Sequence, residues 1–160
     1  MPTTRVDPSG SVEITLVDAL YLVHWIGADP SAIPFLIDDV RQVAKARLGP
    51  LFYVAVYDAE APRQSPGLRR EVVQWFRQLT SIVDHVYIVV TAQGFSASRI
   101  RSQLASLALI VGGKNATVTT GFDELLEAEA DKLGQAPGAI RHQLRSLGYL
   151  PRGDTPSIVP

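Results

Sequence analysis

Cysteine is absent from all 160 residues. Disulfide bonds, cysteine-ligated zinc and thiol catalysis are therefore excluded. The three histidines are scattered along the chain and form neither an HExxH motif nor another metal-ligand spacing, and the sequence contains no nucleophile elbow. Because no enzyme motif is present, we expect no catalytic residue, no metal and no cofactor.

Charge and long apolar runs are also scarce. Charged residues make up 19% of the chain and the formal net charge is -1, so no broad basic field exists to attract nucleic acid or an anionic membrane. No stretch approaches the ~20 apolar residues that span a bilayer, and the first residues, MPTTRVDPSGSVEI, lack the apolar run of a signal peptide. We therefore expect a soluble, cytoplasmic protein of one domain.

Strand and helix patterns alternate along most of the chain. Two β-rich pieces, 12–18 and 20–27, flank a tight turn and predict an antiparallel hairpin, with Tyr21, Val23 and Trp25 on one face of its second strand. The remaining expected elements are strands at 50–58, 85–92 and 115–121, and helices at 35–48, 68–79, 96–113, 122–133 and 137–147. Since strands that alternate with helices need right-handed crossovers, we predict an α/β fold with a mixed, mostly parallel five-stranded sheet and four main helices.

The ends of the chain differ from its middle in composition. Residues 1–11 are polar and contain Pro2, Pro8 and Gly10, so we expect a flexible N-terminus. Residues 12–134 are expected to form the α/β domain. Residues 135–160 are then a C-terminal extension that consists of a short helix and a tail.

Four stretches carry a resemblance to a known family. They are the hairpin VEITLVDALYLVHWIG, the helix end RQVAKARLG before the strand LFYVAVYD, the turn QSPGL, and the closing VTTGFDELLEAEADKLG. Their order is similar to that of the STAS domain, the fold of bacterial anti-sigma-factor antagonists and SpoIIAA-like proteins. The resemblance covers 12–133 and implies a non-enzymatic regulatory domain that binds a protein partner, an anti-sigma-factor kinase.

The turn QSPGL is the one short motif in this resemblance. In phosphoregulated members the turn carries an acidic residue, a phosphorylatable serine or threonine, a second small hydroxyl residue, a glycine and an apolar residue. Aligned on Gly67 and Leu68, Ser65 fills the acceptor position, whereas Gln64 replaces the acidic residue and Pro66 replaces the second hydroxyl. The resemblance thus implies Ser65 as a candidate phosphoacceptor, while the residues alone also predict a plain helix N-cap that is followed by proline.

Basic residues surround this turn. Arg63, Arg69 and Arg70 could bind a carboxylate or phosphate group of a partner through paired hydrogen bonds. Positive charge at the start of a helix has the wrong sign for the helix dipole, which favours a binding role. A second turn, after the strand at 85–92, would lie beside the first. We predict a partner-binding face made of Arg63, Gln64, Ser65, Gly67, Arg69, Arg70, Gly94, Ser96, Ser98 and Arg99.

Two other functions remain open at this point. One is a binding module for a small anionic or lipid ligand at the ends of the parallel strands, where open sheets usually bind ligands. The other is a scaffold module without a phosphoswitch, in which Gln64 and Pro66 mark a lost acceptor. If Ser65 is instead a working acceptor, its phosphorylation adds about two negative charges and weakens docking.

Overall fold

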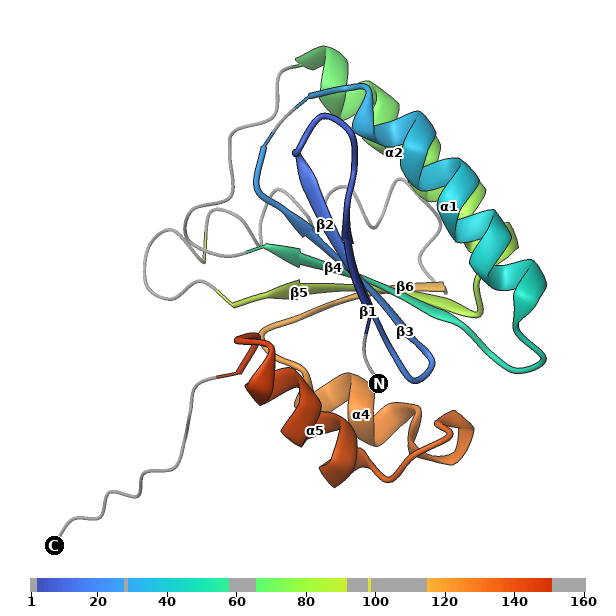
Figure 1. Cartoon of the computed structure of the whole chain (residues 1–160), viewed down its shortest axis with the longest axis vertical. Helices are drawn as coiled ribbons and strands as arrows, with labels where there is room; N and C mark the ends of the chain where they lie inside the picture. Colours follow the sequence, from blue (N-terminus) through green and yellow to red (C-terminus); the bar gives the residue numbers. More distant parts are fainter. Residues whose placement is uncertain (1–2, 28, 58–65, 92–97, 99–114, 151–160) are drawn as a thin grey trace, which may run out of the picture.

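A computed structural model describes residues 3–27, 29–57, 66–91, 98 and 115–150, with only the backbone at 66–69 and 72 (Figure 1). The strands are β1 (Thr3–Val6), β2 (Val12–Val17), β3 (Leu20–Trp25), β4 (Phe52–Tyr57), β5 (His85–Val90) and β6 (Ala116–Thr119). The helices are α1 (Ala32–Ala46), α2 (Pro66–Ile82), α4 (Asp123–Ala128) and α5 (Pro137–Ser146), and a short 3-10 helix, η2, spans Ala130–Lys132.

The sheet follows the order of the chain, from β1 to β6. β2 is antiparallel to both of its neighbours, β1 and β3, and β3 to β6 are parallel to one another. A two-residue turn joins β2 to β3, and its first residue, Asp18, has a φ of 51°, a left-handed conformation that aspartate tolerates better than most residues. The prediction of an α/β fold with an N-terminal hairpin and a mixed, mostly parallel sheet is confirmed.

The sheet has six strands instead of the expected five, because the N-terminal residues form β1. Every residue of β1 is exposed, so this edge strand has no apolar alternation that could reveal it. Arg5 pairs with Asp39 of α1, and the carboxylate of Asp7 accepts hydrogen bonds from the backbone N–H of Val12 at 2.8 Å and of Ser9 at 3.0 Å. The prediction of a flexible N-terminus is therefore wrong for residues 3–11.

Helices cover both faces of the sheet (Figure 1). Because the strand order never reverses, right-handed crossovers place α1 and α2 on the same face. There, apolar side chains of both helices pack on the first core cluster, which includes Leu36, Val40, Trp75, Phe76, Leu79, Tyr21, Val23, Tyr53 and Ala55.

The opposite face is covered by α4 and α5. Their buried side chains Leu125, Leu126, Ile140 and Leu144 pack with Leu22, Val54, Tyr87 and Val89 of the sheet. Residues 137–150 therefore belong to the same domain as the sheet and do not form a separate extension.

Several expected helices have different ends, and α2, expected at 68–79, spans Pro66–Ile82. We expected the first to carry its apolar stripe to Leu48, but α1 ends at Ala46 and Leu48 is fully exposed. The chain turns away at Arg47, whose guanidinium donates to the backbone carbonyls of Asp18 and Pro50 at 2.8 and 3.2 Å. The helix expected at 122–133 is divided into α4 and η2.

The helix expected at 96–113 lies outside the described residues except for Ser98, which is helical. Within the described part of the chain, no helix combines the length and the apolar composition that crossing a bilayer requires.

Candidate functional site

Most of the predicted docking face lies outside the described residues. These positions are Arg63, Gln64, Ser65, Gly94, Ser96 and Arg99. Gly67 and Arg69 belong to α2, but only their backbone is described. Arg70 and Ser98 have described side chains, and both are exposed. The suggested contact between the two turns stays a prediction.

The start of α2 agrees with the sequence. The helix begins at Pro66, directly after Ser65, and its first turn contains no acidic residue. Trp75 and Phe76 of α2 are both buried. Among the side chains of α2 that the structure describes, the exposed ones are polar or charged, namely Arg70, Glu71, Gln74, Arg77, Gln78 and Ser81. A partner that docks on this part of the helix would therefore meet polar side chains.

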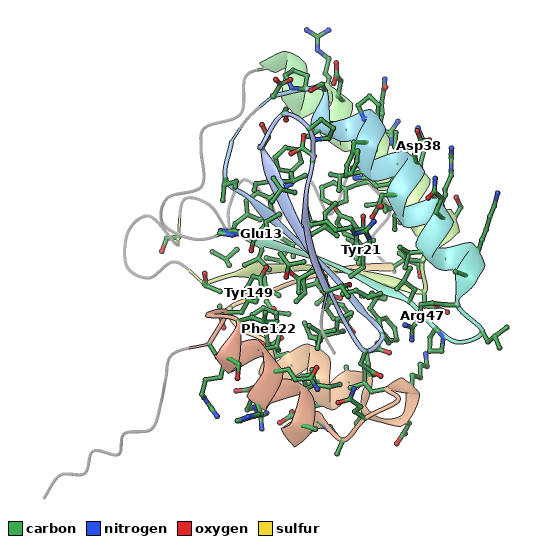
Figure 2. All side chains as sticks on the ribbon, in the orientation of Figure 1. Glu13, Tyr21, Asp38, Arg47, Phe122 and Tyr149 are labelled. Carbon is green, nitrogen blue, oxygen red and sulfur yellow. The ribbon has the colours of Figure 1, made fainter. Side chains whose placement is uncertain are left out.

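A pocket of about 310 Å³ lies at the carboxyl ends of β3, β4 and β5, on the face that α5 covers. Its lining combines strand residues with the segment that follows α5: Glu13, His24, Ile26, Val56, Thr91, Leu147, Gly148 and Tyr149. Figure 2 labels Glu13 and Tyr149, which come from opposite ends of the chain and lie on the same side of the molecule. The pocket therefore forms only when the segment that follows α5 packs against the sheet.

Three of the lining residues form a row across the sheet. Glu13 of β2 lies directly opposite His24 of β3, and His24 is the register partner of Val56 in β4. Side chains at such positions are close neighbours on one face. Apart from the buried Thr15, the neighbouring side chains on this face are apolar and buried, with Val17, Leu20, Leu22, Phe52, Val54 and Val89. Glu13 and His24 therefore interrupt an apolar surface at the point where the pocket opens.

Tyr149 closes the pocket from the α5 side. Gly148, with a φ of 88°, makes the turn that brings it there, a conformation that glycine adopts without strain. The ring of Tyr149 packs edge-on against His24 and against Phe122, each with a centroid separation of 6.2 Å.

The hydroxyl of Tyr149 is buried. It has no partner in hydrogen-bonding geometry among the described residues. Burial raises the pKa of this phenol, and the negative charge of Glu13 adds to the increase, whereas Thr15 lies close enough to oppose it. A hydroxyl in this position is able to hydrogen-bond a molecule that enters the pocket.

The chemistry of the lining disfavours the small anionic ligand that the sequence left open as an alternative at the strand ends. The described residues around the pocket include one carboxylate and no lysine or arginine. The strand order also has no reversal, so the crevice at which open sheets usually bind ligands is missing. In the described ranges, no group of three or more histidine, aspartate or glutamate side chains is arranged to hold a metal ion.

A second polar cluster lies at the amino ends of the parallel strands. His85 Nε2 is 2.7 Å from Thr117 Oγ1, and the Tyr87 hydroxyl donates to Glu129 Oε1 at 2.7 Å. Lys132 Nζ is 3.8 Å from the other oxygen of Glu129. Burial raises the pKa of Tyr87, with Glu129 adding to the rise, and burial lowers the pKa of His85. These contacts join β5 to β6 and η2, which is a structural role.

Glu13, His24 and Tyr149 were not predicted as site residues. The signal available in the sequence was weak: three polar residues, Glu13, Thr15 and His24, on a hairpin face whose other members are apolar. Tyr149 gave no signal, because it belongs to a segment whose packing depends on the whole fold.

Comparisons with known proteins name no family. No family model matches the chain, and no curated protein matches it. A solved structure with some likeness is a domain from a provisionally assigned UDP-N-acetylmuramate:L-alanyl-gamma-D-glutamyl-medo-diaminopimelate ligase of Haemophilus ducreyi 35000HP. The two chains are 17% identical in sequence, and their alignment covers 89% of this chain and 98% of the ligase domain. The TM-score is 0.42, and this likeness assigns no function.

Proposed function

We propose that this chain is a non-enzymatic regulatory domain that binds a protein partner, as its resemblance to anti-sigma-factor antagonists implies. The partner would be a kinase of the anti-sigma-factor type. The order of elements supports the proposal, since a hairpin is followed by parallel strands that are added one beside the next. The start of α2 at Pro66 supports it as well, because this leaves Ser65 at the position just before the helix.

The charge at the start of α2 is the observation that carries the proposal. Its first turn has no acidic residue, and Arg70 is exposed. The amino end of a helix already carries a partial positive charge, so an added arginine costs the helix stability. An acidic group of a partner would compensate both charges. A phosphate on Ser65 would neutralise the same charge from within and so release the partner.

The docking test compares two arginines on the same helix. Arg70→Glu places a negative charge in the proposed interface, whereas Arg77→Glu makes the same change at an exposed position two turns further on. We expect one anti-sigma-factor kinase of the source organism to bind the unaltered protein in calorimetry. Arg70→Glu should weaken this binding by about tenfold or more, as charge reversal at an interface does, and Arg77→Glu should change it by less than about twofold. If no such kinase binds, or if both variants behave alike, the docking proposal is wrong.

The phosphoswitch needs its own test. Incubation with the binding kinase and ATP should add one phosphate to the unaltered protein and none to Ser65→Ala, as intact mass would show. If the kinase binds but Ser65 stays unmodified, the scaffold function without a switch is the correct one.

A second candidate function is favoured by the pocket at the carboxyl ends of β3, β4 and β5. It has a volume of about 310 Å³ and brings together polar and apolar side chains. This volume is at the small end of the range for ligand sites, roughly 300–1,000 Å³. A module that binds a small ligand, alone or together with a protein partner, agrees with this geometry.

A further inference from the structure

We infer that the pocket takes a small organic cation, with an ammonium-type head on a short apolar body. The inference rests on the ligand-binding function proposed above and goes beyond it by naming the class of ligand. The charge of this ligand is opposite to that of the small anionic ligand that the sequence left open as an alternative.

The head group is selected by Glu13. Its side chain is half-buried, and no described residue forms an ion pair with it. No lysine or arginine is among the described residues that line the pocket. A half-buried carboxylate is stabilised by a positively charged hydrogen-bond donor and repels an anion. An ammonium group supplies both the charge and the donors.

Hydroxyl groups complete the polar side of the pocket. The Tyr149 hydroxyl is buried without a partner in hydrogen-bonding geometry, and Thr91 Oγ1 has only a long contact of 3.5 Å to the carbonyl of Tyr57. An ammonium head has three N–H donors. The Tyr149 hydroxyl and the carboxylate of Glu13, whose charge acts on the phenol, therefore offer acceptors for two of these donors, whereas Thr91 lines the pocket three strands away from Glu13.

The body of the ligand is selected by apolar side chains at the mouth. Ile26 and Leu147 line the pocket and are 50% and 37% exposed, although large apolar residues are buried in most of the described structure. Val56 forms the floor and is buried. A short aliphatic chain would cover these side chains and remove them from water. A volume of about 310 Å³ is at the small end of the range for ligand sites and fits a head group with a short chain.

The test uses three probes that share a 3-methylbutyl group and differ in the head group attached to it: 3-methylbutylamine, 3-methylbutan-1-ol and 4-methylpentanoate. Each is added to the full chain while backbone amide shifts are followed by NMR. We expect the amine to shift the amides of Glu13, His24, Thr91 and Tyr149, the alcohol to shift the same amides at higher concentration, and the carboxylate to leave them unchanged. Glu13→Gln should weaken amine binding about tenfold, because a charge-assisted hydrogen bond is lost, and should leave alcohol binding unchanged.

Glu127→Gln is the matched control, since Glu127 is exposed on α4, and it should bind the amine as the unaltered protein does. If the carboxylate binds more tightly than the amine, or Glu13→Gln has no effect, the pocket takes a ligand but the cationic class is wrong. If none of the probes shifts the pocket amides, the ligand-binding function itself fails. The comparison of probes on the unaltered protein gives this answer even if Glu13→Gln does not fold.

Discussion

The side chain of Asp39 links helix α1 to two strands of the sheet, β1 and β3. Its carboxylate is buried, receives two hydrogen bonds from Arg5 of β1, and accepts a third from the hydroxyl of Tyr21 in β3 at 2.5 Å. The neighbouring Asp38 is exposed. The two residues look alike in the sequence, because only the arrival of β1 beside α1 gives Asp39 its partners.

Asp39→Ala should lower the free energy of unfolding by about 1–3 kcal/mol, since the buried Tyr21 hydroxyl loses its acceptor. The loss of the ion pair adds little, because the Arg5 side chain is 44% exposed and returns to water. Asp38→Ala is the matched control and should change stability by less than about 0.5 kcal/mol. Urea unfolding of both variants measures the difference. Equal effects would show that the Asp39 contacts do not stabilise the fold.

His85 predicts a pH dependence of stability. Burial lowers its pKa from the ordinary value of 6.5, and Lys132 acts in the same direction, while Glu129 opposes them. The unfolded chain therefore binds a proton here at a higher pH than the folded chain does. By linkage, this residue makes the protein less stable as the pH falls through and below 6.5.

His85→Gln keeps a hydrogen-bonding side chain beside Thr117 and removes the titration. Urea midpoints should therefore decrease less for His85→Gln than for the unaltered protein between neutral and mildly acidic pH. The same decrease in both proteins would assign the pH dependence to other groups.

Among the elements, α5 and β1 differ most from what the sequence suggested. The hairpin was predicted correctly down to its faces, with Tyr21, Val23 and Trp25 in one core cluster and Leu22 in the other, because alternation within a strand is a local pattern. β1 has no such pattern, since all its side chains are exposed. α5 has an apolar stripe, but a stripe alone does not tell which surface it covers.

Ile140 tests the role of α5. Its side chain is fully buried between α5 and the sheet. Ile140→Ala should lower the free energy of unfolding by about 2–5 kcal/mol, the usual cost of a large-to-small change in a core. His142→Ala, at an exposed position on the same helix, should have almost no effect. If both variants unfold alike, α5 does not pack on the sheet in solution.

For the molecule as a whole, the boundaries of the domain lie further out than the sequence indicated. A chain shortened to residues 12–134 lacks β1 and α5, so the sheet loses its edge strand and the apolar side chains below α5 face water. Residues 3–150 keep every described element. We expect the shorter chain to show no cooperative unfolding transition, and the longer one to unfold like the full protein. Urea titration followed by tryptophan fluorescence compares them, and a cooperative transition for residues 12–134 would contradict this boundary.

The candidate pocket also requires the complete fold. Glu13 and His24 are neighbours through the hairpin, which the sequence predicted, but Tyr149 reaches them only after the chain has crossed the sheet and returned through α5. Local sequence patterns do not indicate that the chain passes back over the sheet after β6. The start of α2, in contrast, could be predicted, since a serine followed by proline before an apolar stripe is a local signal.

The order of the strands has a consequence for folding during synthesis on the ribosome. Each parallel strand that emerges can pair at once with the strand synthesised just before it, so the nascent chain assembles its sheet progressively. α5 is made long after β2 and β3, yet it covers the sheet on which they lie. Until α5 has been synthesised, the apolar side chains that it covers in the folded protein are exposed to solvent. A chaperone would bind the nascent chain in this interval.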